Sequence, residues 1–236
     1  MVVAPDSSST TAPSYGVLVD DVEHELEMKR SRFITYLGRI EREDDAREFI
    51  ELTRHEHRTA RHHCSAFVLG SRRQLQRSND DGEPSGTAGA PMLETLAGFI
   101  RPGQHSPDIS DTIAVVVRYF GGVLLGTGGL VRAYTDSVTE ALGGARFTTR
   151  QQMRKYAVTA PLEAAGRWEN QLRGAKISVF NADYTAAGVR FTLGVPDAQA
   201  QVTALEADIA TLSHGHATLE LLDTGWVDIP CEVTPS

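Results

Sequence analysis

The chain has 236 residues, 41% of them hydrophobic and 23% charged, which is the composition of a globular protein with one large core or two small ones. Its net charge of −8 disfavours indiscriminate binding to nucleic acids, and no apolar run reaches the ~18–20 residues of a membrane span. Two cysteines, Cys64 and Cys231, are too few for a disulfide framework, so we expect a cytoplasmic protein with no membrane contact and no disulfide-linked partner.

The N-terminal third predicts a tail, two strands and a helix. Residues 1–15 are rich in Ser, Thr, Ala and Pro without a cationic start or an apolar stretch, so we expect a disordered tail rather than a secretory signal. Residues 23–29 alternate weakly between polar and apolar, and residues 32–40 are rich in aromatic and β-branched residues. Both patterns are typical of strands. Asp45 and Glu48 are spaced as a capping pair, and the apolar periodicity after Asp45 predicts a helix that ends near His57.

The middle of the chain predicts the core of a first domain, residues 16–148. Residues 64–69 are typical of a buried strand, and residues 79–90 have loop composition. Pro91 is suited to the first position of a short helix. The β-branched run at 112–117 predicts a central strand; a glycine-rich loop at 121–129 follows, and then a helix from Leu130 that stops at Gly143 and Gly144.

A second domain is predicted over residues 151–232. Strands are expected at 156–160, 176–182, 187–195 and 217–229, and helices at 163–173 and 198–212. This β-α-β-β-α-β order is that of a ferredoxin-like unit. The sequence therefore predicts an α+β protein of two domains.

The segment from Arg118 to Tyr134, RYFGGVLLGTGGLVRAY, has five glycines in nine residues between a strand and a helix. Glycines leave backbone amides uncovered and permit positive φ, and the first amides of a helix carry a partial positive charge. We therefore predict an anion-binding loop. Its candidate residues are Arg118, Gly121, Gly122, Gly126, Gly128, Gly129 and Arg132. The alternative is that the glycines only let the strand and the helix pack closely.

This loop matches neither of the common nucleotide-binding motifs. A Walker A loop ends in Gly-Lys-Ser/Thr, whereas Leu130 follows the glycines here. The dinucleotide fingerprint fails because its third glycine is missing. We expect no cofactor.

Basic residues are concentrated between Arg54 and Arg77, where six arginines and four histidines stand against one acid, Glu56. Arg61 and His63 join the candidates for anion or nucleic-acid binding on this basis. The alternative is a solvated face in a chain that favours Arg over Lys. Zinc is disfavoured because His-x-His and His-His-Cys match no usual ligand spacing, and a strand sends His63 and Cys64 to opposite faces.

Three carboxylates, Asp80, Asp81 and Glu83, lie together in the loop before Pro91. The spacing fails for an EF-hand calcium loop. A magnesium site completed by a bound phosphate is the weaker hypothesis. We favour carboxylates that bond to the backbone of a tight turn or pair with the arginines, and we predict no metal.

Four segments resemble the IMPACT/YigZ family in their order along the chain. They are KRSRF (residues 29–33), RHHCSA (61–66), DDGEPSGTAG (80–89) and RYFGGVLLGTGGLVRAY (118–134). The glycine-loop signature of the family is usually close to RYFGGIKLGAGGLVRAY, so the family often has a lysine where this chain has a leucine. The resemblance covers roughly residues 16–145, and the unit after it is similar to the small second domain of bacterial members.

This resemblance implies a fold and a general role. The first domain would share the fold of a small-subunit ribosomal protein domain and of domain IV of elongation factor G, with a ferredoxin-like second domain. Eukaryotic relatives act in translational control, and bacterial members are proposed to bind nucleic acid or the ribosome. No established reaction comes with the resemblance.

Three functions therefore remain open, and the first is favoured. It is a translation-related binding protein that contacts RNA, the ribosome or a translation factor through the anion-binding loop. The second is a magnesium-assisted enzyme acting on a phosphorylated small molecule or a nucleotide. The third is a protein-docking module without nucleic acid. Because no clear base stands beside a clear nucleophile, the sequence leans away from an enzyme.

Overall fold

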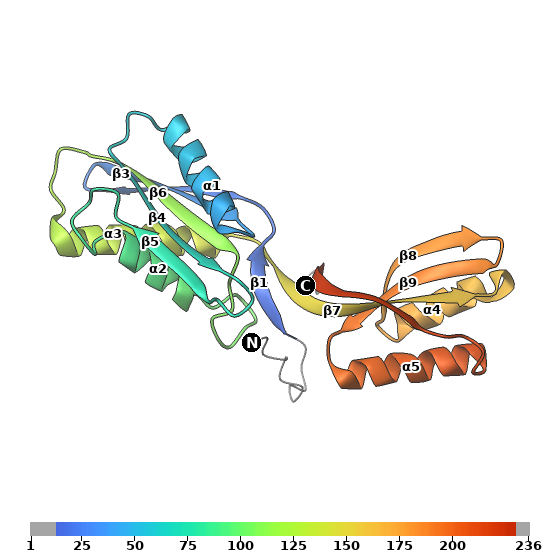
Figure 1. Cartoon of the computed structure of the whole chain (residues 1–236). Helices are drawn as coiled ribbons and strands as arrows, with labels where there is room; N and C mark the ends of the chain where they lie inside the picture. The colour runs from blue at the N-terminus through green and yellow to red at the C-terminus, as the bar shows by residue number, and fades with distance from the viewer. Residues whose placement is uncertain (1–12, 230–236) are drawn as a thin grey trace, which may run out of the picture. The chain divides into compact units, whose positions relative to one another are not determined.

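The computed structural model describes residues 13–229, which form two compact units, residues 15–149 and residues 150–229 (Figure 1). Most of the predicted tail, and residues 230–232 of the predicted second domain, lie outside the described residues. Strand β1 (Ser14–Leu18) begins inside the predicted tail. Tyr15 is buried there and its hydroxyl donates a 2.6 Å hydrogen bond to Asp111, so the ordered chain begins earlier than expected.

The first unit is built on an antiparallel sheet in the order β2-β3-β6-β4-β5. Its strands are β2 (Val22–Met28), β3 (Ser31–Arg39), β4 (His62–Leu69), β5 (Leu75–Asn79) and β6 (Thr112–Tyr119). β6 is the middle strand, as its β-branched run predicts. β5 was not predicted, because its sequence LQRSN is mostly polar; it is an edge strand whose side chains are largely exposed.

Helices cover both faces of this sheet (Figure 1). α1 (Glu43–Glu56) packs on one face, and α2 (Gly89–Gly98) and α3 (Gly126–Gly144) pack on the other. Alternation along β6 sends Ile113 and Val115 to the α1 side and Ala114 and Val116 to the α2–α3 side. Burial on both faces explains why β6 has a continuous apolar run.

Three helices begin earlier than the sequence predicts. α2 starts at Gly89, so Pro91 is at its third position rather than its first. α1 starts at Glu43, and the Asp45 carboxylate reaches back from the third position to accept the amides of Glu41 and Arg42, both at 2.9 Å. Asp45 therefore caps the helix from inside its first turn. α3 starts at Gly126 rather than near Leu130, so three glycines of the predicted loop form its first turn.

The second unit has the predicted β-α-β-β-α-β order; the sheet order is β1-β7-β9-β8, and β10 also pairs with β7. Its elements are β7 (Phe147–Ala160), the 3-10 turn η1 (Leu162–Ala164), α4 (Ala165–Gly174), β8 (Ser178–Thr185), β9 (Gly188–Pro196), α5 (Gln199–Ser213) and β10 (Glu220–Ile229). β7 begins at Phe147 instead of Tyr156, so the chain passes from one unit to the next within a strand. The second unit has a core of its own, which includes Trp168, Phe191 and Leu205.

The described helices contain no segment that is both long and apolar enough to cross a membrane.

Candidate anion-binding site

The sequence motifs meet at one end of the sheet of the first unit. Arg118, near the end of β6, pairs in register with Phe33 at the start of β3 and with His62 at the start of β4. The β2–β3 turn, the loop before β4, the acidic loop at 80–88 and the loop before α3 therefore share this end (Figure 1). Segments up to about a hundred residues apart in the sequence are neighbours here.

Glu83 and Arg118 form a buried ion pair beneath these loops. Arg118 Nη1 donates to Glu83 Oε1 at 2.6 Å, and the two side chains are only 8% and 3% exposed. Tyr134 of α3 donates to the same oxygen at 2.9 Å. The pair therefore ties the acidic loop to β6 and α3, and the charge of Arg118 is compensated inside the protein rather than offered to solvent.

Asp80 caps helix α2. Its Oδ1 accepts the amides of Ala88 and Gly89 at 3.0 and 2.8 Å, and its Oδ2 accepts the amide of Gly86 at 2.8 Å. Partial burial opposes ionisation, but these three amides outweigh it and hold the pKa of Asp80 below its usual value. Asp80 therefore does what the sequence predicts for the acidic loop: its carboxylate bonds to the backbone of a tight turn.

Asp81 joins the acidic loop to α1 and β4. Its Oδ1 accepts from Arg54 Nη2 at 2.6 Å, and its Oδ2 accepts the amide of His63 at 2.7 Å. All three candidate metal-binding carboxylates are thus engaged by protein donors. Among residues 13–229, no group of three or more His, Cys, Asp or Glu side chains is arranged to hold a metal ion.

His63 and Cys64 point to opposite faces of β4, as strand alternation predicts. His63 faces α1, where its Nε2 lies 3.2 Å from the His57 carbonyl oxygen, and burial lowers its pKa. The Cys64 thiol faces α3 and lies 3.3 Å from the Tyr134 hydroxyl oxygen; burial raises its pKa to about 12. Both favour the neutral form, so the pair is unsuited to nucleophilic catalysis, and His63 offers no cation to an anion.

The glycine loop, by contrast, is open to solvent. Gly122, Gly126 and Gly128 are exposed, and Gly129 is partly exposed. In the part of the chain that the structure describes, no side-chain cap is present at the start of α3, whose N-cap is Leu125. The Gly121 amide is already used, since it donates to Ser31 Oγ at 3.2 Å. The uncapped start of a 19-residue helix therefore presents its partial positive charge at this end of the unit.

Exposed cations that are not among the predicted site residues also lie beside this loop. Lys29 and Arg30 form the β2–β3 turn, both exposed and both at positive φ. Their backbone touches the loop, because a Cβ at Gly121 would lie 2.0 Å from the Arg30 carbonyl. The sequence KRSRF contained a signal for these residues, because it places two cations at the tip of a tight hairpin.

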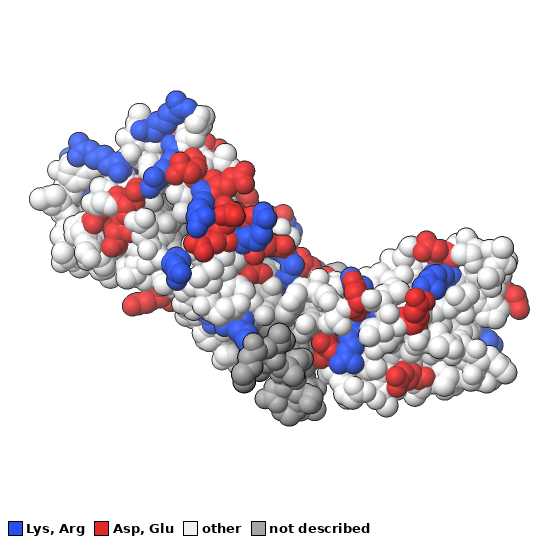
Figure 2. Space-filling model, viewed as in Figure 1, with Lys and Arg blue, Asp and Glu red and all other residues white. Residues whose placement is uncertain are grey.

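Arg132 and Arg61 are also exposed at this end. The Arg132 side chain is 78% exposed and bonds to Asp136 at 3.2 Å, one turn along α3. Arg61 lies just before β4. Figure 2 shows basic side chains standing out at the loop-bearing end of the first unit, with acidic side chains close to them and over the middle of the same face.

The basic stretch from Arg54 to Arg77 does not form one surface. Arg61 precedes β4 and Arg72 follows it, and the eight residues of β4 at roughly 3.3 Å each separate them by about 26 Å. Arg54 is paired with Asp81, and Arg73 bonds to the carbonyls of Pro107 and Ala97. Only the part of the stretch nearest His62 adds to the candidate site.

Apolar side chains are exposed in and after the glycine loop. Phe120 is 50% exposed and Leu124 is 83% exposed, and Val123 and Val131 are also exposed. Leu124 aligns with the lysine of the family signature. The glycine-loop end therefore exposes apolar groups beside uncovered amides and cations.

Comparisons with known proteins identify the family of the chain. The model of the Impact N-terminal domain matches residues 29–142. IMPACT family member YvyE of Bacillus subtilis is 42% identical over 73% of this chain and 76% of its own length. IMPACT family member YigZ of Escherichia coli is 38% identical over 83% of this chain and 91% of its own. A crystal structure of a hypothetical protein, 36% identical, covers 89% of this chain with a TM-score of 0.57. The chain belongs to the IMPACT family.

Proposed function

We propose that this protein is a cytoplasmic, translation-related regulator that contacts RNA, free or in the ribosome, through the glycine-loop end of its first unit. Membership of the IMPACT family supports a regulatory, translation-related role in general. The observation that carries the proposal is the uncapped, exposed start of α3 beside the exposed Lys29–Arg30 turn.

The chemistry of this end suits a phosphate backbone. Free helix amides donate to phosphate oxygens, and Lys29, Arg30, Arg61 and Arg132 supply positive charge around them. Phe120 offers an exposed ring on which a base can stack. Because the whole chain has a net charge of −8, which opposes polyanions, binding is expected to be local and weak rather than indiscriminate.

Two roles of the candidate residues follow from their positions. Gly122, Gly126, Gly128, Gly129 and Arg132 take part in contact with the ligand. Arg118 and Gly121 hold the loop in place instead, the first through Glu83 and the second by close packing against Arg30.

The test is binding of the full-length protein to a labelled single-stranded RNA and to purified ribosomes across a salt series. The double variant Lys29→Ala with Arg30→Ala should bind more weakly, and its log–log salt slope should fall by roughly 0.7 for each lost phosphate contact. Leu124→Lys should have the opposite effect, since it adds a cation at an exposed position of the loop.

The matched control is Arg72→Ala with Arg77→Ala, which removes the same charge from exposed positions after β4 and in β5. It should leave binding near that of the wild type. Equal weakening by both pairs would mean that only net charge matters and would refute the site. Ribosome binding that is insensitive to salt and to all these variants would favour protein docking instead.

A further inference from the structure

A groove lies beside helix α1 in the first unit, away from the glycine loop. Its volume of about 420 Å³ is within the ~300–1,000 Å³ typical of ligand sites. It is lined by α1 on one side and by residues of β2 and β3 on the other, because α1 packs over β4 and β6 rather than over β2. The seven residues of β2, at roughly 3.3 Å each, separate Val22 in this groove from the Lys29–Arg30 turn by about 23 Å.

The groove has a preformed apolar surface. Phe49 and Leu52 line it from α1, where a spacing of three residues places them on the same side of the helix. The Phe49 ring packs on Gly38 of β3 so closely that a Cβ would not fit between them. Tyr36 lines the groove from β3, and its hydroxyl oxygen lies 2.7 Å from His57 Nε2. Leu52 is 59% exposed, so its side chain is available to an apolar group of a ligand.

The charged groups of the groove are all acidic. Asp21, Glu23 and Glu56, the groove carboxylates, are exposed on its lining, and among the described residues that line it there is no Lys, Arg or His. Glu23 is the cross-strand partner of Tyr36, whereas Glu56 belongs to α1. Burial, followed by the negative charges of Glu23 and Glu56, raises the pKa of Tyr36 to about 12. Carboxylates from both sides of the groove therefore act on one ring.

Other acids of α1 have intramolecular partners that the groove carboxylates lack. Asp44 accepts from Arg47 Nη1 at 2.8 Å, and Glu51 lies 3.7 Å from Arg54 Nη1. Within residues 13–229 the groove carboxylates form no ion pair, and no set of acidic or histidine side chains there is arranged to hold a metal ion. Their uncompensated charge therefore suits an organic cation.

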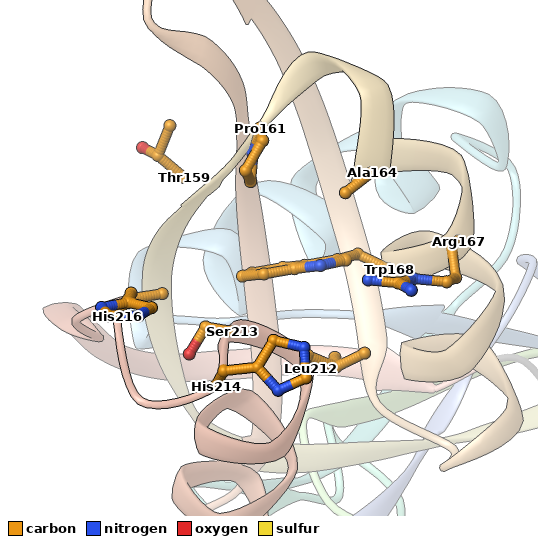
Figure 3. A pocket seen from close by; sticks show the side chains of 10 residues that line it. Thr159, Pro161, Ala164, Arg167, Trp168, Leu212, Ser213, His214 and His216 are labelled. Carbon is orange, nitrogen blue, oxygen red and sulfur yellow. The ribbon is translucent and has the colours of Figure 1, made fainter.

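The pocket of the second unit differs in this respect. It has a volume of about 290 Å³, and Trp168, which is 2% exposed, occupies its centre (Figure 3). Figure 3 shows Arg167 and His216 at opposite ends of the indole, so the charges there do not meet at one point. In the groove beside α1, by contrast, apolar side chains and converging charges of one sign occur together.

We propose that this groove binds a basic segment of a partner protein, with an arginine side chain between the groove carboxylates and an adjacent apolar side chain on Leu52. A guanidinium can stack on the Tyr36 ring while it donates to carboxylates on both sides. An exposed leucine beside it is a group that a protein partner covers, and the acidic lining repels polyanions. The proposal does not rest on the RNA contact proposed above, because none of these residues belongs to the glycine-loop end.

Fluorescence anisotropy of the full-length protein with a labelled probe peptide, Gly-Arg-Leu-Ala-Arg-Leu-Gly, tests this. The probe should bind, and its counterpart with glutamine in place of both arginines should bind at least about tenfold more weakly, the loss expected for one charge-assisted hydrogen bond. The double variant Glu23→Gln with Glu56→Gln should weaken binding of the probe by a similar factor. Leu52→Arg, which introduces a cation at an exposed position of the groove, should abolish binding.

The matched control is Glu48→Gln with Glu51→Gln, which removes the same charge from exposed positions of α1 outside the groove. The proposal is overturned if the probe binds no more tightly than about 1 mM, if the glutamine peptide binds equally well, or if the two double variants weaken binding equally. Spermidine that binds as tightly as the probe would assign the groove to small polyamines. A dimer of the protein that Leu52→Arg dissociates would assign it to a second copy, and either result also overturns the proposal.

Discussion

Single residues at the candidate site divide into those that hold the loops and those that face solvent. Glu83, Arg118 and Tyr134 meet in the interior, and Asp80 and Asp81 are bonded to backbone amides and to Arg54. Such contacts fix the position of the acidic loop beneath the glycine loop. These charged and polar side chains, which are candidates for chemistry in the sequence, thus stabilise the fold instead, because a buried polar group needs a hydrogen-bond partner.

Glu83→Gln should lower the free energy of unfolding by about 3–5 kcal/mol, because it leaves the Arg118 charge buried and uncompensated. Urea unfolding measures the change. Glu25→Gln breaks an exposed pair with Arg32 and serves as the control, with little effect expected. Equal, small losses in the two variants would contradict a buried pair.

Asp80 should contribute to stability at neutral pH and lose that contribution in acid. Its pKa in the folded protein lies below the ordinary value of 3.8, so the stabilisation is complete above that pH and disappears as the pH falls further through the folded value. Asp80→Asn should lower stability at pH 7 by ~0.5–2 kcal/mol, as loss of a helix cap does. Unfolding measured from pH 7 to pH 2 should show a flatter acid limb in the variant; identical pH profiles would count against the cap.

At the scale of elements, the glycine loop is half loop and half helix. Gly121 is required by close packing, because a side chain there would meet the backbone of Arg30. Gly128 has open space around it in the first turn of α3. The glycines that look alike in sequence therefore have different reasons to be there.

Gly121→Ala should destabilise the protein by about 1–3 kcal/mol, since its Cβ would lie 2.0 Å from backbone atoms and the turn must shift. Gly128→Ala should instead stabilise it by roughly 0.5–1 kcal/mol, the usual gain of Ala over Gly in a helix. Thermal unfolding compares the two. If both changes stabilised the protein, the packing of the β2–β3 turn on Gly121 would be incorrect.

At the scale of the whole chain, each unit has its own core. The first has clusters on both faces of its sheet, and the second packs Trp168, Phe191 and Leu205 between its helices and its sheet. Each core is contributed by residues of one unit alone. Damage to one core is therefore expected to remain in that unit.

Leu205→Ala should lower the stability of the second unit by about 2–5 kcal/mol, because it leaves a cavity at a position 1% exposed. Amide hydrogen exchange should accelerate throughout residues 150–229 and change much less in residues 15–149. Leu221→Ala, at an exposed position of β10, is the control. Equal acceleration in both units would show that they unfold as one.

Local sequence patterns were enough to predict most of the helices and strands and to identify the family. Continuous β-branched runs such as β6, helical periodicity such as that of α5, and four ordered motifs can all be identified from neighbours in sequence. Polar β5, the tail strand β1 and the first half of β7 were missed, because their partners, rather than their own composition, make them strands.

The composition of the site depended on contacts between distant segments. Nothing local reveals that Arg118 is neutralised by Glu83, 35 residues away, or that Lys29 and Arg30 adjoin Gly121. Strand register brings these groups together, and burial then determines which charges are compensated inside the protein and which remain in water. The residue types of an anion site are a property of the sequence, whereas the availability of each charge is a property of packing.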